Sequence, residues 1–328
     1  MLQFLFRRLL WFAITLFSVV TISFFLMRAV RGGPFDTDRA LHPAIEANLE
    51  ARYHLDWPVW KQYLQYVGPF NLDEQGLVVF GGDNSDVFGG VLTGDLGPSF
   101  KLRDFTVNDI IGQSLPISIA LGSVAMAIAL ALGLTAGIVS ALRRGTALDL
   151  GMRLFATIGI ALPNFVIAAF LIIIFAFQLE ALPVAGWGSP RYLPLPALAL
   201  GAPFAAYIAR LTRTGMLEVL SADYIRTARA KGLPEWLVLM RHAIKGGILP
   251  VVSYLGPATA GILTGSLVIE RMFAIPGTGS HFVGSALNRD YTLAMGVTIL
   301  YTVLVYGLNT LVDLAYTLLD PRIELENS

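Results

Sequence analysis

Long stretches without a single charged residue alternate with polar segments along this chain. A helix that crosses the hydrocarbon core of a bilayer needs about 20 predominantly apolar residues. Six uncharged stretches come close to that length or exceed it, and we predict a transmembrane helix in each, which makes the chain an all-α integral membrane protein. The six stretches are Leu9–Met27, Ile110–Leu142, Leu154–Leu179, Tyr192–Ala209, Gly246–Ile269 and Tyr291–Val312.

The composition agrees, with 55% hydrophobic and 14% charged residues. A soluble protein with long buried helices is disfavoured, because soluble helices of this length normally keep a polar face. A transmembrane β-barrel is disfavoured as well, because its strands alternate apolar and polar residues over about ten positions. The formal net charge is zero, which gives no reason to expect a nucleic-acid partner. Membrane lipid is the expected surrounding.

The short loops indicate the orientation, because Lys and Arg concentrate in short cytoplasmic loops. If the N-terminus is cytoplasmic, the two short outer loops hold only Arg191, Arg271 and Arg289. Both termini are therefore predicted to be cytoplasmic. Arg7 and Arg8 precede the first stretch as in a secretory signal, but no A-x-A site follows, so we expect an uncleaved first helix.

This topology divides the chain into a first helix, an extracytoplasmic insertion, a core of five helices and a cytoplasmic tail. In the insertion, apolar residues of Pro43–Tyr66 recur at helical intervals and predict one amphipathic helix or a pair. The Gly- and Asp-rich segment 71–92 is typical of a loop. We expect the insertion to cap the membrane surface. The predicted boundaries are 1–30, 31–113, 114–319 with a cytoplasmic loop at 213–246, and 320–328.

Motifs of enzyme chemistry are missing from the sequence. There is no G-x-x-x-x-G-K-[ST], no H-E-x-x-H, no G-x-S-x-G and no cysteine, which argues against a P-loop ATPase, a metalloprotease, a serine hydrolase and thiolate chemistry. We expect no metal site and no catalytic residue. The spans contain almost no ionisable side chain, which argues against a proton- or sodium-coupled carrier. If the chain transports a substrate, the energy is expected to come from elsewhere.

The largest predicted cytoplasmic loop has the pattern of a helix, a break and a second helix. It contains YIRTARAKGLPEW, residues 224–236. Ser221 and Asp223 are expected to cap a short helix, and Gly232 with Pro234 to end it. Topology alone explains the basic charge but not the cap or the break. A short helix with small residues is suited to dock into a groove of a cytoplasmic partner.

The stretch D-Y-I-R-T-A-R-A-K-G-L, with a following R-H-A, resembles the coupling loop of bacterial ABC-importer permeases. Within them it is similar to the peptide/nickel branch and its B-type oligopeptide permease subunits. The general pattern is E-A-A, three residues, G, nine residues, I-x-L-P. With Gly232 on its glycine, Arg226, Thr227 and Ala228 occupy E-A-A and residues 242–245 occupy I-x-L-P. Only Ala228 and Gly232 match, so a role borrowed from the consensus glutamate stays open.

The resemblance covers nearly the whole chain. It extends to FRRLLWFAITLFSVVTISFFLMR, to GDLGPSF with VNDIIGQSLPISIALG, to VIERMFAIPGTGSHFVGSALNRDY and to LVDLAYTLLDPRI. The segment Gly76–Gly90 is longer than the resemblance leads us to expect. The implied architecture is a type I ABC importer permease with six transmembrane helices, in the bacterial cytoplasmic (inner) membrane.

The implied activity is transport of oligopeptides, without catalysis by this chain. Dipeptides, glutathione or nickel complexes are the alternatives within the branch. A membrane enzyme or scaffold is the alternative outside it, but the spans show no reactive constellation. The implied partners are a second, homologous permease subunit forming a heterodimer, two cytoplasmic ATPase subunits and an extracytoplasmic peptide-binding protein. No cofactor is expected in this chain, because ATP and Mg would bind to the ATPases.

The resemblance also implies site residues. The expected coupling helix covers 222–234, and its contact residues are Asp223, Arg226, Thr227, Ala228, Arg229, Ala230, Lys231 and Gly232. An outer turn or gate is expected to involve Glu270, Pro276, Gly277, Gly279, Asn288 and Asp290; an ordinary surface turn is the alternative. Mildly polar residues expected along the pathway are Asn164, Ser253, Tyr254, Thr264, Ser266, Tyr301 and Asn309. Such residues also serve as hydrogen-bonding groups between helices.

Overall fold

The structure is a computed structural model that describes residues 2–29, 33–35, 43–68, 70–71, 78–79, 90–102 and 104–319. These ranges are almost entirely helical, apart from loops and one antiparallel pair of two-residue strands, β1 (Phe70–Asn71) and β2 (Val78–Val79). The chain forms two compact units. The first unit consists of Met1–Pro116 and Ser280–Leu304, and the second of Ile117–Gly279 and Val305–Ser328.

The first unit is built on the N-terminal helix and the segment that follows it. Its helices are α1 (Leu2–Ala29), α2 (Pro43–Arg52), α3 (Val59–Val67), η1 (Val91–Thr93) and the first parts of α4 (Val107–Leu142) and α14 (Tyr291–Leu319), with most of α13 (Thr278–Asn288). Phe24 of α1 is buried in its core together with Tyr66 of α3 and Met295 of α14. Tyr63 of α3 packs edge-on against Phe24, with 5.3 Å between ring centroids.

The two helices α2 and α3 confirm the pair predicted within residues 43–66. They are separated by a turn in which His54 has a positive φ. The predicted 71–92 loop lies mostly outside the described residues, as does most of Gly76–Gly90. The same is true of the tail at 320–328. The predicted domain boundaries follow membrane topology and stay a prediction.

The second unit is organised around α7 (Pro194–Leu220), against which α5, α6, α10 and α11 all pack. More than half of the most apolar part of the span Pro190–Leu220, which contains α7, is buried. The other elements of this unit are α5 (Ala147–Ala161), α6 (Asn164–Leu171), η2 (Ile172–Gln178), η3 (Pro190–Tyr192), α8 (Asp223–Ala230), α9 (Glu235–Leu237), η4 (Val238–Ala243), α10 (Ile244–Gly247), α11 (Leu249–Gly265) and α12 (Leu267–Met272).

Five helical segments in the described part of the chain are long and apolar enough to cross a membrane, and a bent pair brings the number to six if it counts as one span. The five are Phe6–Ala29, Val107–Leu142, Pro190–Leu220, Leu249–Met272 and Tyr291–Val312. They correspond to the first, second, fourth, fifth and sixth predicted spans. The prediction of an all-α membrane protein is therefore confirmed.

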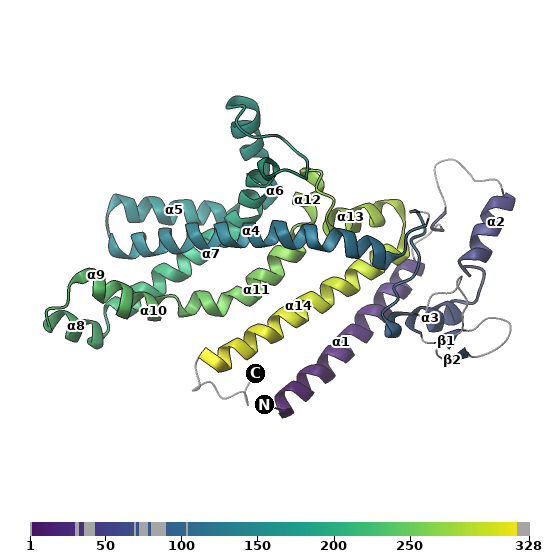
Figure 1. The fold of residues 1–328 in the computed structure, drawn as a ribbon, viewed down its shortest axis with the longest axis horizontal. Coiled ribbons are helices and arrows are strands. Elements are labelled where there is room, and N and C mark those ends of the chain that lie inside the picture. Colours follow the sequence, from purple (N-terminus) through teal and green to yellow (C-terminus); the bar gives the residue numbers. More distant parts are fainter. Residues whose placement is uncertain are drawn as a thin grey trace. The chain divides into compact units, whose positions relative to one another are not determined.

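The third predicted span, Leu154–Leu179, is not one straight helix. The structure breaks it into α5 and α6–η2, which meet at 112° (Figure 1). Pro163 explains the break, because it has no N–H to donate and disfavours helical geometry at the residue before it. Accordingly Leu162 has an extended ψ of 132° and Pro163 stands as the cap residue of α6. The sequence analysis predicted one transmembrane helix over this stretch and did not predict the break.

Glycines allow α4 and α7 to approach closely within the second unit. A Cβ on Gly137 would lie 2.5 Å from Cβ of Thr212 and 2.6 Å from the carbonyl oxygen of Ala209. One turn earlier, a Cβ on Gly133 would lie 2.7 Å from the carbonyl oxygen of Ala205. Small residues four apart bring membrane helices into backbone contact in this way.

We predict that Gly137→Ala destabilises the protein, because the added methyl group has to displace Thr212 or the backbone of α7. Overpacking of this kind costs about 1–3 kcal/mol. The measurement is the melting temperature of the purified protein in detergent. Gly151→Ala is the matched control, since Gly151 of α5 has open space around its Cβ position. A melting temperature of Gly137→Ala at or above that of the wild type would contradict the packing argument.

Candidate functional site

The predicted coupling loop contains the short helix α8 between two breaks. Its N-terminal end differs from the prediction, because neither Ser221 nor Asp223 caps it. The cap position is Ala222, which makes no side-chain cap hydrogen bond. Ser221 instead donates its hydroxyl to the carbonyl oxygen of Glu218 at 2.7 Å and so closes the end of α7. Asp223 lies in the first turn of α8, where a carboxylate interacts favourably with the helix dipole.

One face of α8 is buried against its own chain. Ile225 is fully buried and Ala228 is 7% exposed, in a cluster with Met216 of α7 and Val238 of η4. Ala228 therefore lies on the packed face of α8. The members of the predicted coupling set on the exposed side are Asp223, Arg226, Thr227, Arg229, Ala230, Lys231 and Gly232.

Gly232 ends α8 in the geometry that the sequence predicts. Its φ is +75°, a left-handed conformation that glycine adopts without steric cost. Its N–H donates to the carbonyl oxygen of Arg229 at 2.9 Å, and no atom lies within 4 Å of the position a Cβ would take. Pro234 then precedes α9. The predicted helix, break and second helix are thus present.

A bidentate ion pair bridges this break. Arg229 of α8 donates from Nη2 to Oε1 of Glu235 at 2.6 Å and from Nε to Oε2 at 3.1 Å. These hydrogen bonds hold the pKa of Glu235 below its ordinary value. The pair was not predicted, because a Glu six residues after an Arg becomes its neighbour only through the turn at Gly232. It fixes the direction in which α9 leaves α8.

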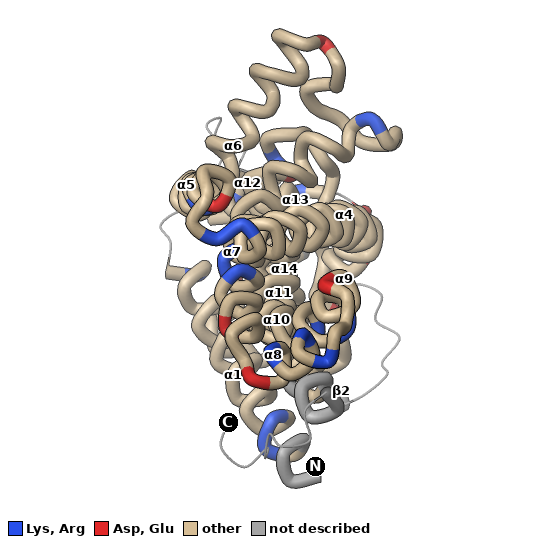
Figure 2. The backbone as a smooth tube through the Cα atoms, turned by 90° about the vertical axis from the view of Figure 1, so that its left-hand side faces the viewer, with Lys and Arg blue, Asp and Glu red and all other residues tan. Residues whose placement is uncertain are grey.

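The same loop exposes large apolar side chains. Trp236 and Met240 are each 66% exposed and Tyr224 is 51% exposed. Figure 1 shows α8 and α9 projecting beyond the ends of α4 and α5, and in Figure 2 basic residues lie along the tube around α8 and α9. Exposed aromatic residues beside cations are typical of docking surfaces. The sequence analysis did not predict Trp236 and Met240 as site residues. They follow Pro234 and are four residues apart, which places both on one face of a helix.

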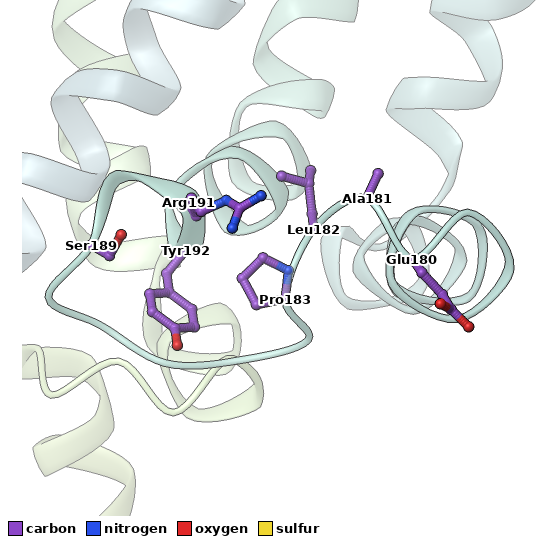
Figure 3. Close-up of a pocket in the computed structure, with 7 residues that line it drawn as sticks. All are labelled: Glu180, Ala181, Leu182, Pro183, Ser189, Arg191 and Tyr192. Atoms are coloured by element: carbon purple, nitrogen blue, oxygen red, sulfur yellow. The ribbon is translucent and has the colours of Figure 1, made fainter.

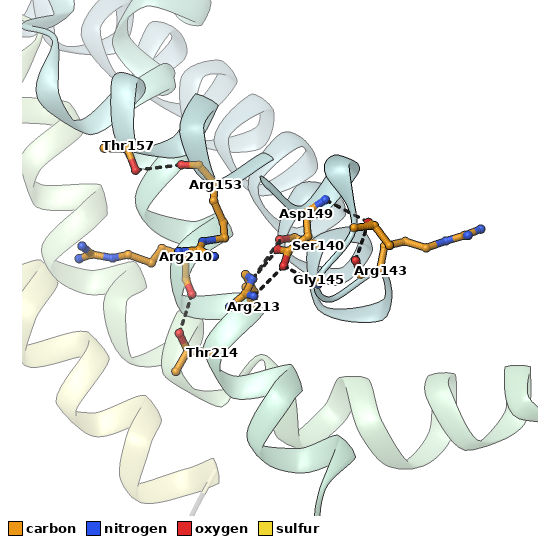
Figure 4. Close-up of polar contacts among 10 residues, drawn as sticks. Ser140, Arg143, Gly145, Asp149, Arg153, Thr157, Arg210, Arg213 and Thr214 are labelled. Carbon is orange, nitrogen blue, oxygen red and sulfur yellow. Dashed lines mark hydrogen bonds and ion pairs between the residues drawn. The ribbon is translucent and has the colours of Figure 1, made fainter. Parts of the chain in front are cut away.

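Asp149, at the start of α5, is buried and forms a second ion pair (Figure 4). The pair lies near the end of α7 that leads into the predicted coupling loop. Arg213 of α7 donates to Asp149 from Nε at 2.8 Å and from Nη2 at 2.9 Å. Ser140 of α4 and the N–H of Gly145 also donate to its carboxylate. The cluster thereby joins α4, α5 and α7. The sequence analysis did not predict this cluster, although the T-x-x-D spacing of Thr146 and Asp149 is typical of a helix start.

The predicted outer turn is centred on Glu270, which is fully buried. Ser118 of α4 and Ser266 donate their hydroxyls to Oε1, each at 2.7 Å. The N–H of Gly279 donates to Oε2 at 2.8 Å. Glu270, Gly277 and Gly279 are thus brought together, and Pro276 is exposed beside them.

Asp290 lies in the first unit and is also buried. Its burial distinguishes it from a residue of an ordinary surface turn. Its carboxylate accepts hydrogen bonds from the hydroxyl of Ser99 and from the N–H groups of Phe100 and Leu293. It therefore caps α14 and at the same time fixes the segment 98–100 of the insertion. Asn288, two residues earlier, is exposed at the end of α13.

Several of the predicted pathway residues form hydrogen bonds within the chain. Ser253 and Thr264 bond to carbonyl oxygens of their own helix, and Ser266 is buried against Glu270. The ring of Tyr254 in α11 packs against the ring of Tyr207 in α7, with 4.4 Å between the ring centroids. The guanidinium of Arg210 lies over the Tyr207 ring, 4.6 Å from its centroid. The remaining predicted residues are Asn164 at the start of α6, Tyr301 packed near Phe282, and Asn309 in α14.

An open pocket of about 350 Å³ lies in the loop between η2 and η3 (Figure 3). In that view Arg191 and Tyr192 extend toward Pro183, whereas the carboxylate of Glu180 points away. The pocket shares no lining residue with the predicted site. Among the described residues no group of three or more His, Cys, Asp or Glu could hold a metal ion. The described part of the chain thus offers helical spans, buried hydrogen-bonding centres and a projecting loop.

The long apolar helices in the described part of the chain are those of an integral membrane protein. The chain belongs to the family of binding-protein-dependent transport system inner membrane components, which it matches over residues 133–325. It is accordingly a permease subunit of an ABC transport system and an inner-membrane component.

The relatives support this over the full length. The chain is 44% identical over 325 residues to the oligopeptide transport system permease protein OppB of Salmonella typhimurium, covering 98% of this chain and 99% of that protein. It is 42% identical to the dipeptide transport system permease protein DppB of Bacillus subtilis, covering 99% of each. An inward-facing structure of the MetNI methionine ABC transporter has a similar fold, with a TM-score of 0.56 at 16% identity over 64% of this chain and 96% of the matched one.

We predict that the Arg229–Glu235 pair orders the turn between α8 and α9. Glu235→Gln or Arg229→Gln should speed hydrogen exchange of the amides in 229–237, and the double reversal Arg229→Glu with Glu235→Arg should restore part of the protection. The control is Asp223→Asn, because the Asp223–Arg226 pair is longer, at 3.4 Å, and far more exposed. Equal protection in Glu235→Gln and wild type would contradict the prediction.

The pair also predicts a pH dependence. Because the pKa of Glu235 is lower in the folded loop, the stabilisation is complete above the ordinary glutamate pKa of about 4.3 and is lost as the pH falls through the lowered value. Protection factors in 229–237 should therefore stay constant between about pH 6 and 8. In Glu235→Gln they should be lower throughout that range.

Proposed function

We propose that this chain is the permease subunit of an ATP-driven importer for oligopeptides and forms half of the translocation pathway. The observation that carries the proposal is the 44% identity to an oligopeptide permease over 98% of the chain. It includes the predicted coupling loop and the predicted outer turn. Both segments form defined structures here, a short helix with an exposed face and a turn bonded to a buried carboxylate.

The exposed side of α8 and the adjacent Trp236 and Met240 form the proposed contact with a cytoplasmic ATPase. Lys231 and Arg226 are exposed beside them, so an acidic rim around an apolar pocket is the complementary surface. In this proposal two ATPase subunits bind ATP and Mg, and this chain holds no cofactor. A homologous second permease subunit completes the pathway.

The loop charges support an orientation in which both termini are cytoplasmic. Arg143 and Arg144 follow α4 and Arg226, Arg229 and Lys231 lie in the coupling loop, as the distribution of cations in short loops requires. The turn around Glu270 then faces the opposite side. There it is the proposed outer gate, next to the expected contact with a peptide-binding protein.

The pathway itself is proposed to run along polar and aromatic side chains of the spans. Tyr254 is the best-supported member of the predicted set, because it is half-buried and its ring packs against that of Tyr207. Ser253, Asn164, Tyr301 and Asn309 stay candidates. Aromatic and mildly polar groups tolerate different side chains, which a peptide pathway requires.

The experiment that tests the function is purification of the intact complex from native membranes, identification of the co-eluting chains and measurement of peptide uptake. Labelled tri- to pentapeptides should enter cells that contain the complex, and a binding protein and ATPase subunits should co-elute. Uptake restricted to dipeptides would replace the oligopeptide assignment, a possibility that the Bacillus subtilis relative raises. Absence of any ATPase from the complex would overturn the proposal.

We predict that Gly232→Val reduces peptide uptake at least tenfold while the protein still inserts and accumulates in the membrane. A β-branched residue is poorly compatible with φ of +75°, at a cost of roughly 1–2 kcal/mol, so α8 and α9 change direction. Gly232→Asn should keep more uptake, because Asn tolerates this conformation better.

Gly188→Val is the matched control for this substitution. Gly188 has a positive φ of 97° and open space around its Cβ position, but it lies in the loop between η2 and η3. The same kind of backbone strain should leave uptake there close to the wild-type level. Normal uptake by Gly232→Val would remove the coupling role of this turn.

A further inference from the structure

Glu270 is surrounded by hydrogen-bond donors from three separate segments. Ser118 comes from α4, Ser266 from the junction of α11 and α12, and Gly279 from the beginning of α13. Ser118 also accepts the N–H of Thr278 at 2.9 Å. A fully buried carboxylate is costly unless its oxygens are well satisfied. Here both oxygens accept hydrogen bonds, so the carboxylate stabilises the turn instead of disrupting the core.

The turn is shaped around this carboxylate. A Cβ on Gly277 would collide with Oε2 of Glu270 and lie 2.5 Å from Oγ of Ser118. A Cβ on Gly279 would lie 2.9 Å from the same carboxylate oxygen and 2.8 Å from Cα of Leu267. The two glycines of P-G-T-G are thus required by the position of Glu270, since neither has an open space for a side chain.

Two of the partners of Glu270, Ser266 and Gly279, lie where a helix begins or ends, whereas Ser118 lies within the continuous helix α4. Ser266 stands between α11 and α12, Ser118 follows Pro116 by two residues, and Gly279 follows the Pro276 turn. The second unit begins at Ile117 and runs to Gly279. Glu270 and these three partners therefore all belong to the second unit.

We propose that Glu270 is a positioning residue that makes the Pro276–Gly279 turn move as one body with α4 and α12 during transport. The proposal rests on the transport function proposed above and concerns the mechanics of its outer gate. A rigid turn transmits a displacement of α12 to the chain that follows, whereas a loose turn absorbs it. Loss of the carboxylate should therefore uncouple ATP hydrolysis from uptake.

The test uses the complete complex in lipid nanodiscs and two spin labels on this chain. The chain contains no cysteine, so Pro276→Cys and Leu142→Cys introduce the only labelling sites in it. Leu142 is 43% exposed at the end of α4. In the otherwise wild-type chain the distance distribution should be narrow and have the same mean without nucleotide and after trapping with ATP and vanadate. With Glu270→Gln the distribution should broaden, and with the same complex in proteoliposomes the number of peptides imported per ATP should fall at least tenfold.

Glu180→Gln is the matched control, because Glu180 is an exposed carboxylate of the same unit. It should leave distance and coupling unchanged. A narrow distribution in Glu270→Gln, or a shift of the wild-type mean on trapping, overturns the proposal. If the complex with Glu270→Gln fails to assemble, Ser266→Ala removes one hydrogen-bond donor and retains the carboxylate. A broadened distance distribution in Ser266→Ala then supports the positioning role of Glu270, and an unchanged distribution overturns it. A complex that imports no peptide refutes the proposed transport function. The measured distances still test the positioning role of Glu270 in that case.

Discussion

Every interruption of a membrane helix exposes backbone N–H and C=O groups that lipid cannot bond, and this chain must satisfy them internally. Buried carboxylates supply much of that satisfaction in the described structure. Asp290 caps α14 and also binds the segment 98–100. Glu270 accepts the N–H that begins α13, and Asp149 accepts the N–H of Gly145 between α4 and α5. Each carboxylate thus bonds to a backbone N–H at or near a helix terminus and attaches it to another segment.

These attachments differ from the exposed coupling loop in how they hold the chain. Around Glu270 and Asp149 the donors converge on buried oxygens, and removing one partner would leave an unsatisfied polar group. At α8 the turn depends on the backbone freedom of Gly232 and on an ion pair that solvent reaches. Such a pair contributes little free energy, yet its two-point geometry restricts the angle between α8 and α9. A loop that has to transmit motion needs a defined angle more than a large stability.

The sequence predicted most of the fold because lipid imposes one simple rule, and a run of about 20 uncharged residues satisfies it. It failed where a single residue decided between a bend and a break. Pro163 interrupts the apolar run without adding a charge, so a search for uncharged stretches does not find the break between α5 and α6. Ser221 fitted both the end of α7 and the start of α8, and only the backbone geometry separates the two.

The site was predicted unevenly for a related reason. Gly232 and the turn around Gly277 and Gly279 were accessible because local backbone geometry leaves a mark in local sequence. The burial of Glu270, in contrast, depends on Ser118, which is 152 residues away, and no local pattern contains that partner. The glycines reveal the dependence in retrospect, since a residue without a side chain at 277 and 279 is what a carboxylate in that position demands. A short glycine-containing turn after an acidic residue at the end of a spanning helix therefore indicates a turn that is held by a buried carboxylate. Topology alone would class the same residues as a surface loop.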